Sequence, residues 1–339
     1  MNNLSRYGDR KMIVKTVIML ALYFIPIIFL NSGLVNNLWV LFGLYVLAGF
    51  GAAGVGMGIM HDANHGSYSK NRRVNKYLGY TMNLIGASTS VWKIQHNVLH
   101  HTYTNIEGAD DDINPPFILR FSPNAKRYWI HRYQHLYVWL FYGISTLSWV
   151  ISADYVRLTR YYLMGFFHKK NDLPKELLKI IAWKSFYFLF ILILPMMMMP
   201  IAPWIILLAF ISMHFVAGMS LSLVFQAAHV MPGNEFPSPD NNGIIANDWS
   251  IHQLETTCNF SPRNKFFFWS LGGLNYQIEH HLFPNISHVH YKELSRIVAD
   301  TAKEYGLPYQ IKRTFISAIW DHVRMLRQLG KMQLKPIKG

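Results

Sequence analysis

The sequence predicts an all-α integral membrane protein with four transmembrane helices in two hairpins, together with interfacial helices and a cytoplasmic cap. Of its 339 residues, 51% are hydrophobic and 15% are charged, against about 25% charged residues in soluble domains. The hydrophobic residues are concentrated in long blocks, which a basic soluble nucleic-acid-binding domain would not have. We therefore attribute the net charge of +14 to segments that flank a membrane, and we expect one domain over residues 1–339 and no nucleic-acid partner.

Four segments are long and apolar enough to cross a bilayer, because about 20 helical residues cross a hydrocarbon core of about 30 Å. They are residues 12–30, 38–60, 180–199 and 201–225. The connection inside each pair is short, so each pair is predicted to form a helical hairpin. Residues 77–91 are too short to cross. Residues 136–153 are ambiguous by hydropathy, and we assign them to the membrane interface, where Trp139, Tyr142 and Trp149 are favoured.

The positions of the basic residues predict the orientation. No Lys or Arg occurs in residues 21–65 or 185–262, whereas residues 157–179 are strongly basic. The positive-inside rule then places both termini and the segments 61–179 and 226–339 in the cytoplasm. A crossing by residues 136–153 would move the basic segment outside, which is a second reason for four spans. We expect a multi-pass protein of a bacterial inner membrane or an endoplasmic-reticulum-like membrane.

Seven of the sixteen histidines form three clusters at the cytoplasmic ends of the predicted spans. They are His61 and His65, then His96, His100 and His101, then His280 and His281. Residues i and i+4 share one face of a helix, so each of the first two clusters can direct two imidazoles to one point. Neutral imidazole is a good ligand for iron, zinc, copper or nickel. Because all three clusters are predicted on one side of the membrane, they can converge on one metal site.

The number of histidines favours two metal ions. A structural zinc site uses four ligands and a catalytic zinc site uses three, so seven imidazoles exceed both. Soluble di-iron bundles use E-x-x-H motifs, and zinc proteases use H-E-x-x-H; neither motif occurs in this chain. A di-iron centre with nitrogen ligands is the remaining hypothesis.

The clusters and the segments around them resemble the membrane fatty acid desaturase family. The resemblance extends from about Met12 to Tyr291 and is detailed in HDANHGSYS, QHNVLHHTYTNIEGADDDI, DWSIHQLETTCNF and GGLNYQIEHHLFPNISHVHY. These segments are most similar to the linoleoyl-CoA or front-end (Δ6-like) branch, in which Gln277 stands at the first position of an H-x-x-H-H box. The resemblance implies an O2-dependent oxidoreductase that introduces a cis double bond into a fatty acyl chain linked to CoA or to a lipid.

By this resemblance, two irons are bound by His61, His65, His96, His100, His101, His280 and His281, with His229 as a further ligand. Relatives carry Asn four residues before this last histidine, where this chain has Phe225 followed by Gln226. Gln277 is expected in the outer shell of the centre. The candidates to orient the imidazoles through their second ring nitrogen are Asp62, Asp110, Asp111, Asp112 and Glu279, and His252 is a further candidate contact.

The implied reaction needs electrons from another protein. The only G-x-G-x-x-G sequence, Gly49–Gly54, lies inside the second predicted span with no strand before it. We therefore expect two iron ions and no bound flavin, haem or nicotinamide. Only about a dozen residues precede the first span, so we expect no fused cytochrome b5 domain and a separate donor such as ferredoxin or cytochrome b5. A basic cytoplasmic face would attract an acidic donor.

Two other functions stay open from the sequence. A fatty acyl hydroxylase would use the same di-iron centre and the same first hydrogen abstraction. A multi-pass metal transporter is the alternative from another class, but its polar ligands should lie at mid-membrane depth, whereas these histidines gather at one surface. The position of the double bond, the chain length, the acyl carrier and the oligomeric state are not specified by the sequence.

Overall fold

The computed structural model describes residues 5–167 and 172–332, which form helices and one small parallel sheet. Its chain divides into two compact units. The first contains Met1–Ile94 and Phe141–Ser222, and the second contains Gln95–Leu140 and Leu223–Gly339. Each unit is described by itself.

The first unit holds the long apolar helices. In chain order they and the short helices beside them are α1 (Arg10–Leu30), α2 (Leu38–Val55), α3 (His61–Asn64), α4 (Arg72–Gly79), α5 (Thr81–Leu84), α6 (Thr89–Trp92), α9 (Asp154–Leu163), α10 (Asp172–Phe188) and α11 (Leu194–Met198). Two helices, α8 (Gln134–Ser148) and α12 (Pro203–His229), have residues in both units. Short π-helical turns at Gly56–Met60, Trp149–Ala153 and Leu189–Ile193 join successive α-helices into longer runs.

Five helical runs in the described residues are long and apolar enough to cross a membrane, by length and composition. They are Arg10–Leu30, Leu38–Asn64, Trp129–Leu163, Asp172–Met198 and Pro203–His229. Four of these runs cover the four predicted spans, so the protein is built around several apolar helices as expected. Residues 77–91 are divided among α4, α5 and α6, and none of these short helices can cross.

The fifth run contains residues 136–153, which we assigned to the interface. A 3-10 turn, α8, a π-helical turn and α9 join end to end over 35 residues, or about 50 Å of helix at 1.5 Å per residue. The joined helix is long enough to cross, whereas the apolar stretch alone was ambiguous. The count of four spans and the interfacial position of this segment stay predictions.

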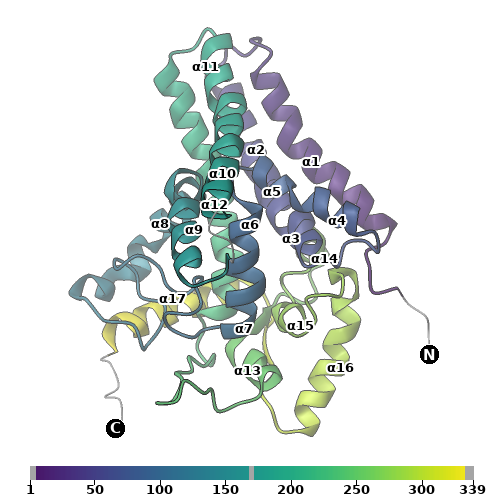
Figure 1. The fold of residues 1–339 in the computed structure, drawn as a ribbon, viewed down its shortest axis with the longest axis vertical. Helices are drawn as coiled ribbons and strands as arrows, with labels where there is room; N and C mark the ends of the chain where they lie inside the picture. Colours follow the sequence, from purple (N-terminus) through teal and green to yellow (C-terminus); the bar gives the residue numbers. More distant parts are fainter. Residues whose placement is uncertain (1–4, 168–171, 333–339) are drawn as a thin grey trace. The chain divides into compact units, whose positions relative to one another are not determined.

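Helices α1 and α2 form a hairpin whose helices lie side by side (Figure 1). Each begins at a polar residue that accepts hydrogen bonds from the first free backbone amides: Asp9 caps α1, and Asn37 caps α2. Where the two helices pack, a side chain on Gly51 would place its Cβ 2.5 Å from the backbone nitrogen of Tyr23. The glycines of the second predicted span thus permit close helix packing.

The second unit contains the shorter elements. They are α7 (His101–Tyr103), α13 (Trp249–Thr256), β1 (Cys258–Phe260), α14 (Lys265–Ser270), α15 (Gln277–Leu282), α16 (Tyr291–Glu304), β2 (Gln310–Lys312) and α17 (Phe315–Lys331). Strands β1 and β2 are parallel, with Cys258 opposite Gln310. The π-helix Lys93–His100 leads into α7.

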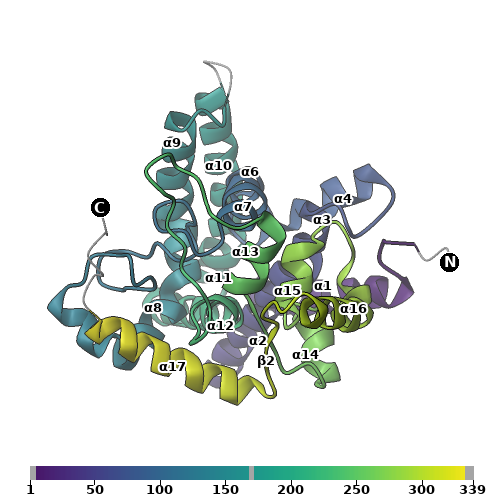
Figure 2. The same cartoon turned by 90° about the horizontal axis from the view of Figure 1, so that it is seen from below.

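Contacts around β1 position α15, which carries the third histidine cluster. The side-chain oxygen of Asn259 in β1 accepts a hydrogen bond from the backbone nitrogen of Ile278, at 2.9 Å. Ile278 packs with Leu254 and Val298 in a buried apolar cluster. Figure 2 shows α15 beside α16, the helix that supplies Val298. Helix α15 is therefore held both by a backbone hydrogen bond and by its apolar side.

Arg120 fixes the loop after the second cluster. Its buried guanidinium donates hydrogen bonds to the carbonyl oxygens of Pro123 and Ala125 in its own loop, and to those of Leu329 and Met332 at the end of α17. These carbonyls at the helix end have no intrahelical partners, and a cation there also interacts favourably with the helix dipole.

Candidate metal centre

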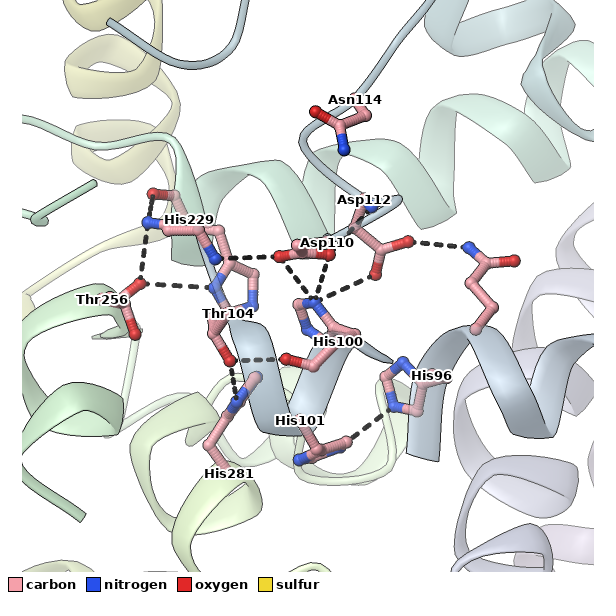
Figure 3. Close-up of polar contacts among 12 residues, drawn as sticks. His96, His100, His101, Thr104, Asp110, Asp112, Asn114, His229, Thr256 and His281 are labelled. Atoms are coloured by element: carbon pink, nitrogen blue, oxygen red, sulfur yellow. Dashed lines mark hydrogen bonds and ion pairs between the residues drawn. The ribbon is translucent and has the colours of Figure 1, made fainter. Parts of the chain in front are cut away.

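Six histidines of the second unit lie together. Figure 3 labels five of them and shows His96, His101, His229 and His281 around His100. All six are at most 5% exposed and come from three segments: His96, His100 and His101 from the π-helix and α7, His229 from the end of α12, and His280 and His281 from α15.

The rings form two groups of three that share one member. The ring centroids of His100, His229 and His281 are 4.8 Å apart in every pair. His101 lies 4.6 Å from His280 and 4.5 Å from His281. Within each group the nitrogen atoms lie within 4.8 Å of one another. Three imidazole nitrogens are a common protein ligand set for a catalytic metal that keeps an open position, so each group is by itself a candidate site for one ion.

The second cluster lies on a π-helix, where we expected an α-helix. The rings of His96 and His100 are stacked, with centroids 5.2 Å apart and planes 23° apart. Nε2 of His101 lies 3.3 Å from Nε2 of His96. Single π-helical turns often occur at functional sites, and here the turn brings three imidazoles of one segment together.

A buried carboxylate orients His100. Its Nδ1 atom lies 3.0 and 3.1 Å from the two carboxylate oxygens of Asp110, and 3.5 Å from Oδ2 of Asp112. Burial alone would lower the pKa of His100, but the negative charges of Asp110 and Asp112 outweigh it and raise the pKa to about 9. Burial also opposes ionisation of Asp110, yet its hydrogen bonds to His100 and to the backbone amides of Asn105 and Asp112 hold its pKa below the ordinary value.

The Nε2 atoms of the group formed by His100, His229 and His281 fit a metal ion. In the described part of the chain, Nε2 of His100 and Nε2 of His229 are buried and make no hydrogen bond. The opposite nitrogen of His229, Nδ1, lies 3.4 Å from the carbonyl oxygen of Thr256. An unsatisfied buried polar atom costs about 1–3 kcal/mol, and two of them in one group of three imidazoles are explained by a bound metal.

Gln253 in α13 is a site residue that the sequence analysis missed. Its side-chain oxygen lies 2.8 Å from Nδ1 of His281. It also accepts a hydrogen bond of 2.8 Å from the hydroxyl of Thr104, which is drawn between His100 and His281 in Figure 3. Because an amide oxygen only accepts, Nδ1 of His281 carries the proton and Nε2 keeps its lone pair. The available signal was its position directly after His252, in the segment DWSIHQLETTCNF that carries part of the family resemblance.

The residues predicted to lie around the histidine ligands make different contacts. Asp112 accepts a hydrogen bond of 2.8 Å from Nε2 of Gln95, and Asp111 is buried in the same turn. His252 directs its Nε2 to the carbonyl oxygen of Thr104, at 2.8 Å, and so supports the backbone after the second cluster. Glu279 turns to the side chains of Asn259 and Tyr309, each at 2.8 Å. Burial raises the pKa of Glu279 to about 7.

The two positions at which this chain departs from the family pattern are also defined. Gln277 is fully buried, and in the described part of the chain neither atom of its side-chain amide makes a hydrogen bond. The ring of Phe225 lies 6.3 Å from the ring of His96, and Gln226 donates a hydrogen bond to the carbonyl oxygen of Asp112. Phe225 thus supplies an apolar contact at the position where the family resemblance leads us to expect an amide.

The first cluster belongs to the first unit. A π-helical turn, Gly56–Met60, leads from α2 directly into α3, which begins at His61. The rings of His61 and His65 are 4.8 Å apart, and both pack against Trp92, at 5.7 and 6.0 Å. The carboxylate of Asp62 lies 4.0 Å from Nδ1 of His61. Two paired imidazoles therefore stand at the end of an apolar helix.

Comparison with known proteins gives matches over most of the chain. The sequence model of the family described as Fatty acid desaturase matches residues 36–313. An sn-1 linoleoyl-lipid 6-desaturase of Arthrospira platensis is 36% identical over 98% of this chain and 89% of its own length. One of the same name from Synechocystis sp. is 36% identical over 86% of this chain and 80% of its own length. An acyl-lipid (8-3)-desaturase of Physcomitrium patens is 34% identical over 96% of this chain and 67% of its own length.

Proposed function

The chain belongs to the fatty acid desaturase family and is a membrane acyl desaturase of the front-end type, and we propose that it acts on lipid-linked acyl chains at a centre of two irons. The relatives named for acyl lipids support the choice of a lipid carrier over CoA. The observation that carries the proposal of two metals is the number of buried imidazoles in the second unit: six lie together in overlapping groups, more than the three or four ligands that a single ion takes, and the one lone pair of His281 serves only one of two ions.

We assign eight histidines as ligands. The six of the second unit are His96, His100, His101, His229, His280 and His281, and the two of the first unit are His61 and His65. The support for the first-unit pair is its spacing, the packing of both rings on Trp92, and the family resemblance of the HDANH segment. When bound, iron supplies the redox chemistry that removes hydrogen from an unactivated methylene, which zinc lacks.

The chain's part is to fix ring tautomers and to exclude water. Asp110 and Gln253 bind the Nδ1 atoms of His100 and His281, so the Nε2 lone pairs of both rings are directed to the metal side. The carbonyl oxygen of Thr256 has the same role for His229. Burial of all six rings in the second unit keeps bulk water from the reacting atoms.

The overall reaction consumes O2, two electrons and two protons, and it releases two molecules of water. Two hydrogens leave neighbouring methylene carbons, which then form the cis double bond. The acyl chain gives up two of the four electrons that reduce O2 to water, so the other two come from a separate donor such as a ferredoxin or cytochrome b5. We propose that both termini and the metal centre face the cytoplasm, from the distribution of Lys and Arg.

Fatty acid analysis of a host that expresses the protein tests the function. We expect a new unsaturated species that is two mass units lighter than its precursor, esterified in membrane lipids, and absent with His100→Ala. His135→Ala is the matched control, because His135 lies outside every group of histidines described above. A product that gains one oxygen would instead make the protein a hydroxylase. Metal uptake into vesicles without O2 consumption would make it a transporter.

Iron analysis of the purified protein tests the centre separately. We expect two irons per chain, and a loss of iron with His100→Ala and His61→Ala. Active protein that contains one iron, or none, would contradict the assignment of two metals.

A further inference from the structure

A cavity of about 450 Å³ lies within the first unit, and no histidine is among the residues that line it. One wall is the segment from Tyr80 through α5 and α6 to Lys93, and the other is formed by residues of α10 from Glu176 to Lys184. Its volume falls in the range of about 300–1,000 Å³ that is usual for small-molecule sites. The cavity is therefore large enough for a polar headgroup and larger than a single small ion requires.

The lining is rich in positive charge. Three lysines, Lys93, Lys179 and Lys184, line the cavity together with one carboxylate, Glu176. Lys184 forms an ion pair with Asp154, at 2.8 Å, and Lys179 forms one with Glu176, at 2.6 Å. In the part of the chain that the structure describes, Lys93 forms no ion pair. One cation facing the cavity is thus left without a carboxylate partner.

The cavity has a closed polar floor and an open basic mouth. The side chain of Lys184 is 6% exposed and donates hydrogen bonds to the carbonyl oxygens of Gly86 and Trp149. The side chain of Lys179 is 65% exposed. Ser90 donates to the second oxygen of Glu176, at 2.8 Å, and so links the two walls. A ligand entering here meets the exposed ammonium of Lys179 first and the buried, hydrogen-bonded Lys184 below it.

The apolar and aromatic residues of the lining indicate the kind of molecule. Ile180 and Trp183 of α10 also line the cavity, directly after Lys179 and directly before Lys184 in the sequence. They lie in the third and fourth turns of the helical run Asp172–Met198, where the predicted span 180–199 begins, and this run is long enough to cross the membrane. Trp and Lys at the end of a span are typical of the membrane–water interface. An occupant that combines an anionic group with apolar chains satisfies both parts of this surface.

We propose that this cavity binds the phosphate-bearing headgroup of an anionic membrane lipid. The phosphate faces Lys93 and Lys179, and the glycerol and acyl chains leave along Ile180 and Trp183. Partial burial lowers the pKa of Lys93, and a bound anion offsets that effect by stabilising the ammonium form. The inference goes beyond the proposed reaction, because lipid binding is measured without turnover and without the metal centre.

Native mass spectrometry of the purified protein tests the proposal. The probes are dioleoyl phosphatidylglycerol, dioleoyl phosphatidylcholine, coenzyme A and inorganic phosphate, and the readout is the apparent Kd of each. We expect phosphatidylglycerol to bind more tightly than phosphatidylcholine. One lysine beside an anionic headgroup corresponds to about a fivefold change in affinity, so Lys93→Gln should weaken phosphatidylglycerol binding about fivefold. Glu176→Gln should strengthen it, because it removes the carboxylate from the lining.

Lys175→Gln is the matched control, since Lys175 is an exposed lysine of α10 that does not line the cavity. Equal affinity for the two lipids, or equal losses in Lys93→Gln and Lys175→Gln, would overturn the proposal. Displacement of phosphatidylglycerol by coenzyme A or inorganic phosphate at equal concentration would assign the cavity to a soluble phosphate and would overturn the lipid assignment.

Discussion

The side-chain oxygen of Gln253 lies 2.8 Å from Nδ1 of His281, the histidine that both three-histidine groups share. A hydrogen bond at Nδ1 fixes the tautomer and the plane of the ring, so that Nε2 of His281 is available as a ligand. The hydroxyl of Thr104 lies 2.8 Å from the same oxygen and 2.7 Å from the carbonyl oxygen of His100, and its single proton is shared between these two acceptors. One amide therefore couples helix α13 to both the second and the third histidine clusters.

Replacing this amide by an apolar group should loosen the centre. We expect Gln253→Leu to lower iron affinity about 10–100-fold, the usual cost of removing a partner of a metal-bound imidazole. Iron content and its release to a chelator measure the effect. Gln253→Glu keeps an acceptor for Nδ1 and should retain most of the iron. Gln328→Leu, at an exposed position of α17, is the control, and an iron content in Gln253→Leu equal to this control would contradict the role.

Asp110 should matter more to the centre than Asp112. Asp110 is fully buried, contacts His100 with both oxygens, and accepts from the amides of Asn105 and Asp112. Asp112 reaches His100 at 3.5 Å with a partly exposed side chain. We expect Asp110→Asn to reduce iron affinity at least tenfold, since it removes the charge that orients the ring, and Asp112→Asn to have a smaller effect. Equal chelator release rates in the two variants would refute this ranking, and exposed Asp240→Asn serves as control.

The hydroxyl of Tyr309 should stabilise the fold through Glu279. It donates a hydrogen bond of 2.8 Å to the buried carboxyl and also contacts Asn259, which holds α15. We expect Tyr309→Phe to lower the free energy of unfolding by about 1–3 kcal/mol, because it removes a partner from a buried polar group. Thermal unfolding in detergent measures the loss. Tyr305→Phe removes a hydroxyl from a residue that is 72% exposed and should be neutral; similar melting temperatures for both variants would disprove the role.

A methyl group on Gly51 should disturb the packing of α1 against α2. Its Cβ would lie 2.5 Å from the backbone nitrogen of Tyr23, an atom that cannot rotate away. Overpacking of this kind costs about 1–3 kcal/mol, so we expect Gly51→Ala to unfold at a clearly lower temperature. At Gly43 of the same helix an added Cβ meets no atom within 4 Å, and Gly43→Ala should leave stability unchanged or raise it. The prediction fails if the two variants unfold together.

The sequence predicted the parts of the fold that depend on local composition. Helices cover all four apolar segments, because about 20 apolar residues suffice to define such a helix. It could not predict how helices continue beyond those segments. The run that contains α8 extends from Trp129 to Leu163 only because a 3-10 turn and a π-helical turn connect its α-helices. A hydropathy pattern does not predict where such turns connect two helices.

The candidate metal centre likewise contains residues that the sequence predicted and residues that it could not predict. The histidines were found because imidazole at a spacing of four residues is a chemical signal in itself. Gln253 and Thr104 carry no such signal, since their value lies in contacts with His281 across 28 and 177 positions of sequence separation. Glu279 was expected to orient an imidazole from its position beside His280, yet its side chain turns to Asn259 and Tyr309. Adjacent residues in a short helix point in different directions, which spacing alone does not resolve.

The direction in which His61 and His65 point depends on one extra residue, the one accommodated by the π-helical turn Gly56–Met60 at the end of α2. Such a turn accommodates one more residue than an α-helical turn, and each residue of an α-helix advances the side chains by about 100°. A deletion within Gly56–Met60 would allow α2 and α3 to merge into one regular helix, and would rotate His61 and His65 away from their present direction. The π-helical turn is therefore needed to direct the two histidines, although a regular α-helix would not contain it. We expect insertions or deletions to be tolerated far less here than in the hairpin tip at residues 31–37.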